Sequence, residues 1–281
     1  MLPLATPAPV AERRKLLCIF LNNTACYSLA WLTVNFICQV VQVRLARRSL
    51  VPGTWDLSGI HFLLPDSGWR RDTVLRVYGT GPLLVLALAV GAFGVFWLRQ
   101  RFRPGLGKPL LLWLAFVGIN QVFGGLLADA VTQSGWWYVP NWLANNGDTW
   151  PGTGLGLLLS ALQLLLGYAL GIPFLLAQDS HTILTYENRF KLIVCALLGP
   201  WLAGSALLAL SKLPHLGLSE VLHYATLGIL LVPLALGLHR PFQGEKEMLP
   251  RPTYVAWGLV GLALLGVLAW RLALGGAGVR I

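Results

Sequence analysis

A few ionisable side chains interrupt otherwise apolar sequence, and their types suit proton exchange. Asp129 follows one apolar stretch directly and is the acidic residue closest to the interior of such a stretch. Glu220 and His223 are spaced i, i+3, so a helix places both on one face. Asp129 and His223 therefore suggest acid–base chemistry in an apolar setting. The plainer alternatives are an interfacial carboxylate for Asp129 and a hydrogen-bonded packing role for His223.

Metal binding by His61, Glu220 and His223 is a second chemistry that these residue types allow. Zinc takes three or four nitrogen or oxygen ligands, so the three side chains with one further carboxylate form a sensible set. A single Glu-x-x-His motif is weak support, because di-iron bundles use two such motifs and additional glutamates. The spacing does not require a metal, and the sequence assigns no cofactor.

Arginines next to an expected helix start indicate a third chemistry, the binding of an anion. Arg70, Arg71 and Arg76 lead into Gly79-Thr80-Gly81, where we expect a helix to begin. Free backbone N–H groups at a helix start and nearby guanidinium groups both favour anions. The alternative is that the glycines merely start a helix while the arginines contact bulk lipid. The candidate ligand-binding residues are Arg70, Arg71, Arg76, Thr80 and Asp129.

Amide side chains also fall within the apolar stretches. Asn35 and Gln39 lie on one helical face with Ser28 and Gln42, which makes a polar stripe. Such a stripe is either interhelical hydrogen-bonding material or the lining of a wet cavity. The polar residues expected within apolar segments are Asn35, Gln39, Asn120, Gln121, Gln163 and His223.

Several familiar mechanisms are not indicated by any motif. The chain has no His-Glu-x-x-His, no Gly-x-Ser-x-Gly and no phosphate-binding loop ending in Gly-Lys-Ser/Thr. All four cysteines fall in apolar stretches and form no Cys-x-x-Cys pair, so they are expected to be small buried side chains.

The elements that must position these residues are seven apolar stretches, each of roughly 20 residues. A helix of about that length crosses a hydrocarbon core ~30 Å thick. We therefore expect an all-α polytopic transmembrane helix bundle, with residues 1–281 forming a single integral membrane domain. The approximate spans are 16–43, 77–98, 109–128, 152–178, 192–211, 221–238 and 252–270.

Composition supports the same class. Charged residues make up 11% of the chain and hydrophobic residues 56%, whereas a soluble protein is about 25% charged. The net charge of +10 invites a nucleic-acid partner. The lysines and arginines lie in loop clusters next to apolar stretches, as topology and anionic lipids favour. We therefore expect the lipid bilayer as partner and no nucleic acid; protein partners are not indicated.

Loop charges predict the orientation. The loop Thr132–Pro151 has no lysine or arginine, so we expect it on the non-cytoplasmic side and the N-terminus in the cytoplasm of a bacterial-type inner membrane. Alternation then places His61, Asp129 and His223 in the non-cytoplasmic half. The loop Arg44–Arg76 strains this scheme because it carries six arginines. Either Val51–Leu64 dips into the bilayer, or the arginines have a role outside.

Three functions remain open from the sequence. The first is binding or transport of a small anionic solute or lipid head group at the non-cytoplasmic side. The second is a membrane-embedded enzyme that uses Asp129 and His223, with or without metal. The third is a non-catalytic subunit or scaffold, which the Trp-rich loop Thr132–Trp142 would suit as a partner surface, although an aromatic belt explains that loop more simply.

Overall fold

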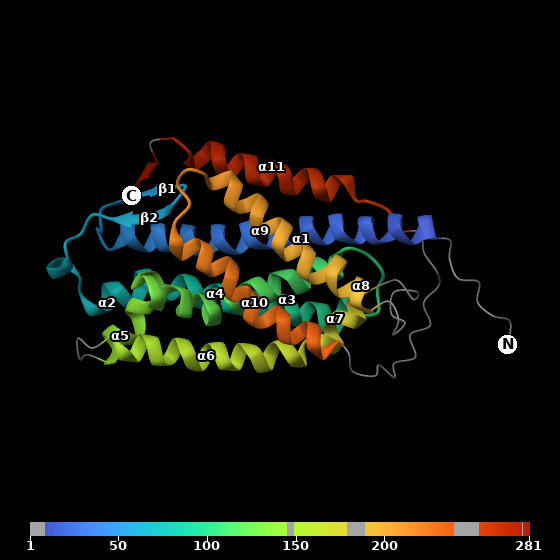
Figure 1. Ribbon diagram of the computed structural model, residues 1–281. Coiled ribbons are helices and arrows are strands. Elements are labelled where there is room, and N and C mark those ends of the chain that lie inside the picture. Colours follow the sequence, from blue (N-terminus) through green and yellow to red (C-terminus); the bar gives the residue numbers. More distant parts are fainter. Residues whose placement is uncertain (1–8, 145–148, 179–188, 239–252, 277) are drawn as a thin grey trace.

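The fold is a bundle of long apolar helices that lie side by side (Figure 1). The computed structural model describes residues 9–144, 149–178, 189–238, 253–276 and 278–281. Within these ranges, seven helices are long and apolar enough to cross a membrane, which confirms the predicted polytopic all-α bundle. They are Glu12–Arg48, Arg71–Gln100, Gly107–Thr132, Trp150–Ala169, Arg189–Lys212, Leu218–Gly237 and Trp257–Leu274.

Some spans combine several helical segments, and short elements connect them. The helices are α1 (Pro9–Arg48), α2 (Arg71–Val74), α3 (Thr80–Val95), α4 (Gly107–Thr132), α5 (Tyr138–Ala144), α6 (Trp150–Ala169), α7 (Gly171–Ala177), α8 (Arg189–Ile193), α9 (Gly199–Lys212), α10 (Leu218–Gly237) and α11 (Trp257–Leu274). Single π-helical turns join α2 to α3 at Leu75–Gly79, extend α3 at Phe96–Gln100, and join α8 to α9 at Val194–Leu198. Short 3₁₀ turns occupy Asp66–Gly68 and Gly135–Trp137.

Helix α4 lies at the centre of the bundle, in contact with α1, α3, α6 and α10. Small residues allow these close approaches, as is usual where helices pack in lipid. A Cβ on Gly118 would lie 2.7 Å from the Cβ of Ala89 in α3. A Cβ on Gly167 of α6 would overlap the carbonyl oxygen of Leu230 in α10. Helix α11 instead packs on the outside, against α1 and α9.

Asparagines near the start of α1 join it to its neighbours. Asn22 donates from Nδ2 to the Tyr254 carbonyl oxygen at 2.9 Å, and its Oδ1 accepts from the Ala256 N–H at 2.9 Å. Asn23 Oδ1 accepts from Trp113 Nε1 at 3.1 Å. In lipid such bonds satisfy polar groups that water cannot reach, so this part of α1 is interhelical hydrogen-bonding material.

A small antiparallel sheet lies next to the last turns of α1, at one end of the bundle (Figure 1). Strand β1 (Gly53–Asp56) pairs with β2 (Gly59–Phe62) and with β3 (Val279–Arg280), in the order β2-β1-β3. Trp55 Nε1 donates to Gln39 Oε1 at 2.8 Å, which fixes the hairpin to α1. The stretch Val51–Leu64 thus contains a hairpin of two strands, and whether it dips into the bilayer stays a prediction. A sheet edge exposed to lipid would leave backbone groups unpaired.

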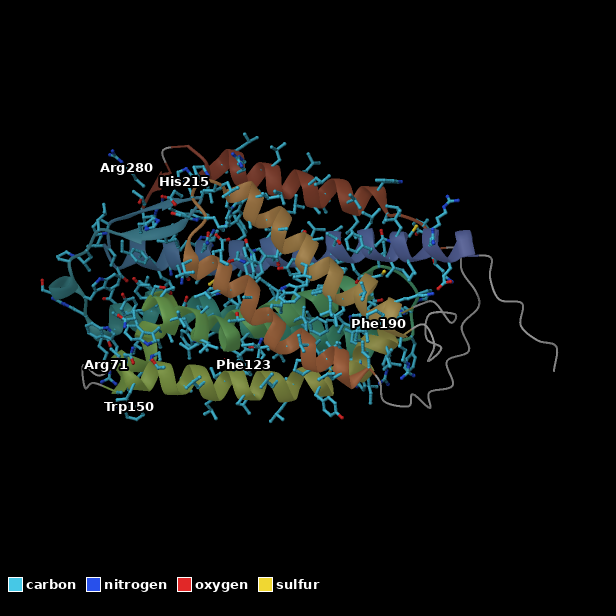
Figure 2. All side chains as sticks on the ribbon, viewed as in Figure 1. Arg71, Phe123, Trp150, Phe190, His215 and Arg280 are labelled. Atoms are coloured by element: carbon cyan, nitrogen blue, oxygen red, sulfur yellow. The ribbon has the colours of Figure 1, made fainter. Side chains whose placement is uncertain are left out.

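The helices alternate in direction, so loops far apart in sequence meet at the same end. Figure 2 shows Arg71, Trp150, His215 and Arg280 at the sheet end of the bundle and Phe190 at the other. The predicted spans match the observed helices in order and direction, with differences at their ends. The largest correction concerns residues 152–178, where α6 ends at Ala169 and the separate helix α7 follows.

Candidate functional site

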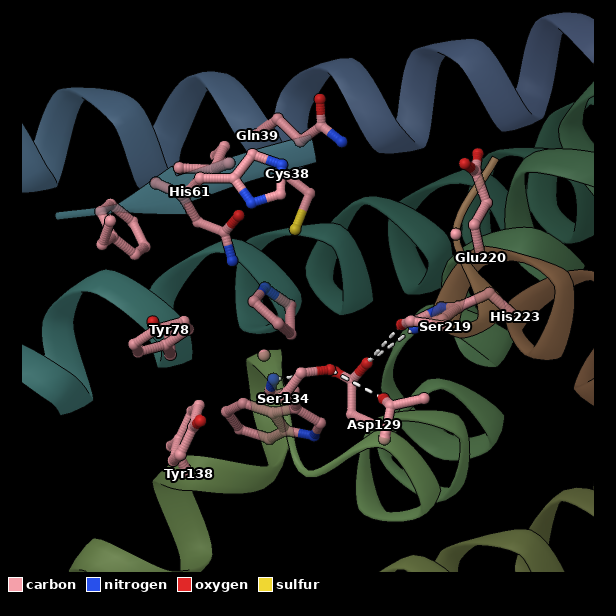
Figure 3. Close-up of a pocket in the computed structure, with 18 of the residues that line it drawn as sticks. Cys38, Gln39, His61, Tyr78, Asp129, Ser134, Tyr138, Ser219, Glu220 and His223 are labelled. Atoms are coloured by element: carbon pink, nitrogen blue, oxygen red, sulfur yellow. Dashed lines mark hydrogen bonds and ion pairs between the residues drawn. The ribbon is translucent and has the colours of Figure 1, made fainter. Parts of the chain in front are cut away.

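A cavity of about 930 Å³ lies at the end of the bundle that carries the sheet (Figure 3). Its walls come from α1, the helix that begins at Arg71, the end of α4 with the turn that follows, α5, the end of α9, the start of α10 and strand β2. Its size falls within the range of small-molecule sites, roughly 300–1,000 Å³. The cavity is the natural place to look for function.

Asp129 and His223 meet at the cavity wall. His223 Nε2 lies 2.9 Å from Asp129 Oδ1, and Ser219 Oγ donates to the same oxygen at 3.3 Å (Figure 3). The Trp136 N–H donates to Asp129 Oδ2 at 2.8 Å. Both oxygens of this buried carboxylate are thus hydrogen-bonded, as a carboxylate in an apolar setting requires. The pair can hold or share one proton.

Local sequence explains how α4 presents this carboxylate. Helix α4 ends at Thr132, and the C-cap residue Gln133 adopts a left-handed conformation with φ 51°. Gly135 follows with φ 56°, a conformation that glycine adopts without steric cost. A Cβ on Gly135 would lie 2.6 Å from Asp129 Oδ2. The chain can therefore fold back over Asp129 only because residue 135 lacks a side chain.

A second ionic pair lies in the same wall, between α9 and α10. Lys212 Nζ forms an ion pair with Glu220 Oε1, and the Tyr224 hydroxyl donates to that oxygen at 2.9 Å. The Lys212 Nζ also lies 5.8 Å from the centre of the Trp270 ring. The side chains of the pair are only 8% and 13% exposed, so each charge is compensated where water is scarce.

Buried amides brace this region from behind the cavity. Asn120 Nδ2 donates to the His223 carbonyl oxygen at 2.9 Å. Gln163 Nε2 donates to Asn120 Oδ1 at 2.9 Å and to the Thr226 carbonyl oxygen at 3.1 Å. Three predicted polar residues, one each from α4, α6 and α10, therefore form one network that holds the backbone of His223 in place.

Other amides face the cavity itself. Asn35, Gln39 and Gln121 all line it, and Gln39 also accepts the bond from Trp55. Asn35 Nδ2 donates to the Trp31 carbonyl oxygen within its own helix at 3.1 Å. The Gln121 side chain forms no hydrogen bond to another described residue, and its Oε1 is buried. Three residues of the stripe on α1 thus line the cavity, Asn35, Gln39 and Gln42, whereas Ser28 Oγ is buried without a hydrogen-bond partner among the described residues.

Aromatic rings form the part of the wall that sequence reasoning missed. Phe62, Trp69 and Tyr78 lie with their ring centres 5.4–5.5 Å apart, and Tyr78 continues to Tyr138 at 5.3 Å. All four line the cavity. The Trp-rich segment 132–142 had suggested an interfacial belt, but Trp136, Tyr138 and Trp142 are cavity residues as well.

The predicted metal site is not assembled. His61, Glu220 and His223 all line the cavity, but each engages a different partner. His61 Nε2 lies 2.6 Å from Ser58 Oγ, while Glu220 binds Lys212 and His223 binds Asp129. Across the described ranges, no three His, Cys, Asp or Glu side chains lie close enough together to hold a metal ion.

The expected helix start at Gly79-Thr80-Gly81 is wrong, because one continuous helix runs from Arg71 to Gln100. Hydropathy rises only near residue 77, but the backbone is already helical in the charged turns before it. Of the predicted anion-binding residues, only Asp129 is among the described residues that line the cavity; the other four are exposed at the surface: Arg70, Arg71, Arg76 and Thr80. Arg71 Nη2 donates to the Leu143 carbonyl oxygen at 3.2 Å.

The hairpin carries one perturbed carboxylate outside the spans. Partial burial of Asp56 opposes its ionisation, but hydrogen bonds from the Ser58 hydroxyl and N–H and the nearby His61 ring outweigh that effect. The pKa of Asp56 is therefore lowered. These contacts stiffen the turn that presents Ser58 and His61 to the cavity.

Comparison of the chain with protein-family models, with curated proteins and with solved structures gave no match.

Proposed function

We propose that this membrane protein binds a small polar molecule, or the polar head of a lipid, in the cavity between α1, α4 and α10. The cavity itself is the observation that carries the proposal. Its wall combines amides, hydroxyls, paired charges and aromatic rings, which together bind and orient polar ligands in otherwise apolar sites. Polar side chains in a membrane protein must face protein or water, and a ligand site uses that requirement.

The loop charges support a position on the non-cytoplasmic side. The segment between α4 and α6, which has no lysine or arginine, contributes Trp136, Tyr138 and Trp142 to the cavity. The predicted anion preference loses its original basis, because the arginines that suggested it lie outside the cavity wall. Binding therefore rests on the cavity side chains.

The test fills the cavity and asks whether a bound molecule is lost. Asn35 lines the cavity, whereas Thr33 lies exposed on the same helix, so Asn35→Phe and Thr33→Phe form a matched pair. The three proteins are purified in detergent, incubated with a total polar lipid extract, and analysed by native mass spectrometry. We expect a defined adduct on the wild type and on Thr33→Phe, and its loss from Asn35→Phe. A wild type without an adduct refutes a lipid head group as the ligand, and an adduct that survives Asn35→Phe refutes the cavity as its binding site.

Acid–base chemistry is a second candidate, favoured by the contact between Asp129 and His223 at the cavity wall. A catalytic pair must exchange its proton as conditions change. Infrared spectra of protein labelled with ¹³C at aspartate carboxyls should then show a band that titrates and is absent from Asp129→Asn. His223 Nε2 lies 2.9 Å from Asp129 Oδ1. The other ring nitrogen, Nδ1, packs against Gly125, 3.3 Å from the position that a Cβ on Gly125 would occupy. A carboxyl band that stays constant across the pH range would assign the pair a purely structural role.

A further inference from the structure

We infer that the cavity takes an uncharged, hydroxyl-rich group, such as a glycosyl or polyol head, in preference to an anion or a cation. This inference rests on the proposed function and names the chemical class of its ligand. Three independent features of the wall carry it: the pairing of its charges, the amide side chains that line it, and its aromatic rings.

The first feature is charge pairing. Asp129 is matched with His223 and Lys212 with Glu220, and His61 lies by Ser58 and Asp56. Each charged side chain among the described residues of this wall already has a partner, so the charge of a charged ligand would not be compensated. Burying an uncompensated charge costs several kcal/mol or more, whereas a neutral polar group needs only hydrogen bonds.

The second feature is the set of amide side chains in the wall. Asn35, Gln39 and Gln121 line the cavity, and the Gln121 side chain makes no hydrogen bond to another described residue. A carboxamide both donates and accepts, and a hydroxyl group does the same, so a ligand rich in hydroxyls can bond to both polar atoms of an amide. A deprotonated phosphate or carboxylate only accepts, and a trimethylammonium group neither donates nor accepts.

The third feature is the ring cluster of Phe62, Trp69, Tyr78 and Tyr138. A sugar ring has apolar C–H faces and polar edges, so it can pack against aromatic rings while its hydroxyls reach amides and carboxylates. The cavity offers these two kinds of surface together. Aromatic side chains also supply rigid contact area at small entropic cost.

Substitution of Gln121 distinguishes a role in ligand binding from a role in the stability of the fold. Its side chain makes no hydrogen bond to another described residue, so Gln121→Leu removes no hydrogen bond within the described part of the chain. A residue kept only for packing would leave ligand binding unchanged when replaced by a similar volume. A residue kept for a ligand would leave stability intact and weaken binding.

The experiment uses octyl compounds that share one chain and differ in the head. The protein is placed in phosphatidylcholine nanodiscs, and saturation-transfer NMR measures binding of octyl glucoside, octyl phosphate and octyltrimethylammonium below their micelle concentrations, with empty nanodiscs as blank. We expect octyl glucoside to bind at least about tenfold more tightly than the other two. Gln121→Leu should weaken that binding about tenfold at unchanged thermal stability, while Thr33→Val leaves it unchanged. Methyl glucoside then identifies the source: equal affinity assigns a water-borne sugar, and much weaker affinity assigns a membrane-borne head group.

Two results would overturn the inference, and they differ in what they leave standing. Tighter binding of octyl phosphate or octyltrimethylammonium, blocked by Asn35→Phe, refutes the hydroxyl-rich class and keeps the proposed binding function. Binding of no probe beyond the empty-nanodisc blank, or binding that Asn35→Phe does not affect, refutes both.

Discussion

Replacing Gln163 by leucine should destabilise the bundle, because this amide joins three helices. Gln163 Nε2 donates to Asn120 Oδ1 and to the Thr226 carbonyl oxygen. Leucine fills a similar volume and donates nothing. After the change, Asn120 Oδ1 keeps no hydrogen-bond partner among the described residues, while its Nδ2 still holds the His223 carbonyl oxygen.

The expected loss follows from the number of bonds. Two interhelical hydrogen bonds in lipid contribute roughly 0.6 kcal/mol each on average. The buried, unpaired Asn120 oxygen adds about 1 kcal/mol. Gln163 Oε1 itself has no partner among the described residues, so leucine removes a cost of similar size. The net loss in the free energy of unfolding is about 1 kcal/mol, which corresponds to a midpoint lower by roughly 2–4 °C.

The assay is thermal unfolding of the purified protein in one detergent, followed by circular dichroism. Gln121→Leu is the matched control: it makes the same chemical change on a side chain that holds no hydrogen bond within the described part of the chain. We expect its midpoint to stay level or to rise. Equal midpoints for the two leucine variants would refute the claim that the Gln163 network supports the fold.

Three further outcomes follow from the structure. Gly167→Ala should force α6 and α10 apart, because the new methyl overlaps the Leu230 carbonyl oxygen; thermal unfolding should show a loss of about 2 kcal/mol or more, and an unchanged midpoint would contradict the packing. Gly135→Ala should displace the Asp129 carboxylate and cost about 1–3 kcal/mol, seen by the same assay. Because the folded-state pKa of Asp56 is lowered, its contribution to hairpin stability is present above about pH 4 and is lost as pH falls below it. Hydrogen exchange of the hairpin amides between about pH 5 and pH 2 should show that loss, and Asp56→Asn should remove it.

The helical part of the fold could be predicted from the sequence because the length and hydropathy of each apolar stretch indicate a membrane-spanning helix. Alternation of the spans also placed His61, Asp129 and His223 at one end, and all three line the cavity there. The contact between Asp129 and His223 could not be predicted in the same way. It depends on the rotation of α4 and α10 about their own axes, which a polar stripe on one helix does not fix relative to another.

One error and two omissions have physical causes that no hydropathy pattern reveals. The helix that begins at Arg71 includes charged turns outside the apolar stretch. A helix forms its backbone hydrogen bonds within itself, so it can continue from lipid into water. The pairing of Trp55 with Val279 joins residues more than 200 positions apart, and short strands with few side-chain contacts leave little signal. The aromatic cavity wall was missed because tryptophan and tyrosine are also typical of the membrane–water interface, and that interpretation was sufficient for the Trp-rich loop.

The length of α1 has a consequence for where the cavity stands in a membrane. Forty residues at 1.5 Å each make a helix ~60 Å long, about twice the thickness of the hydrocarbon core of a bilayer. Even when α1 is tilted by 40° from the bilayer normal, about 15 Å of its length extends beyond the hydrocarbon core. Arg44, Arg47 and Arg48 are exposed on the final turns of α1, so we expect those turns at the membrane–water interface. The hairpin bonded to these turns, and the amides next to it, therefore lie at head-group depth, within reach of molecules that diffuse in the leaflet.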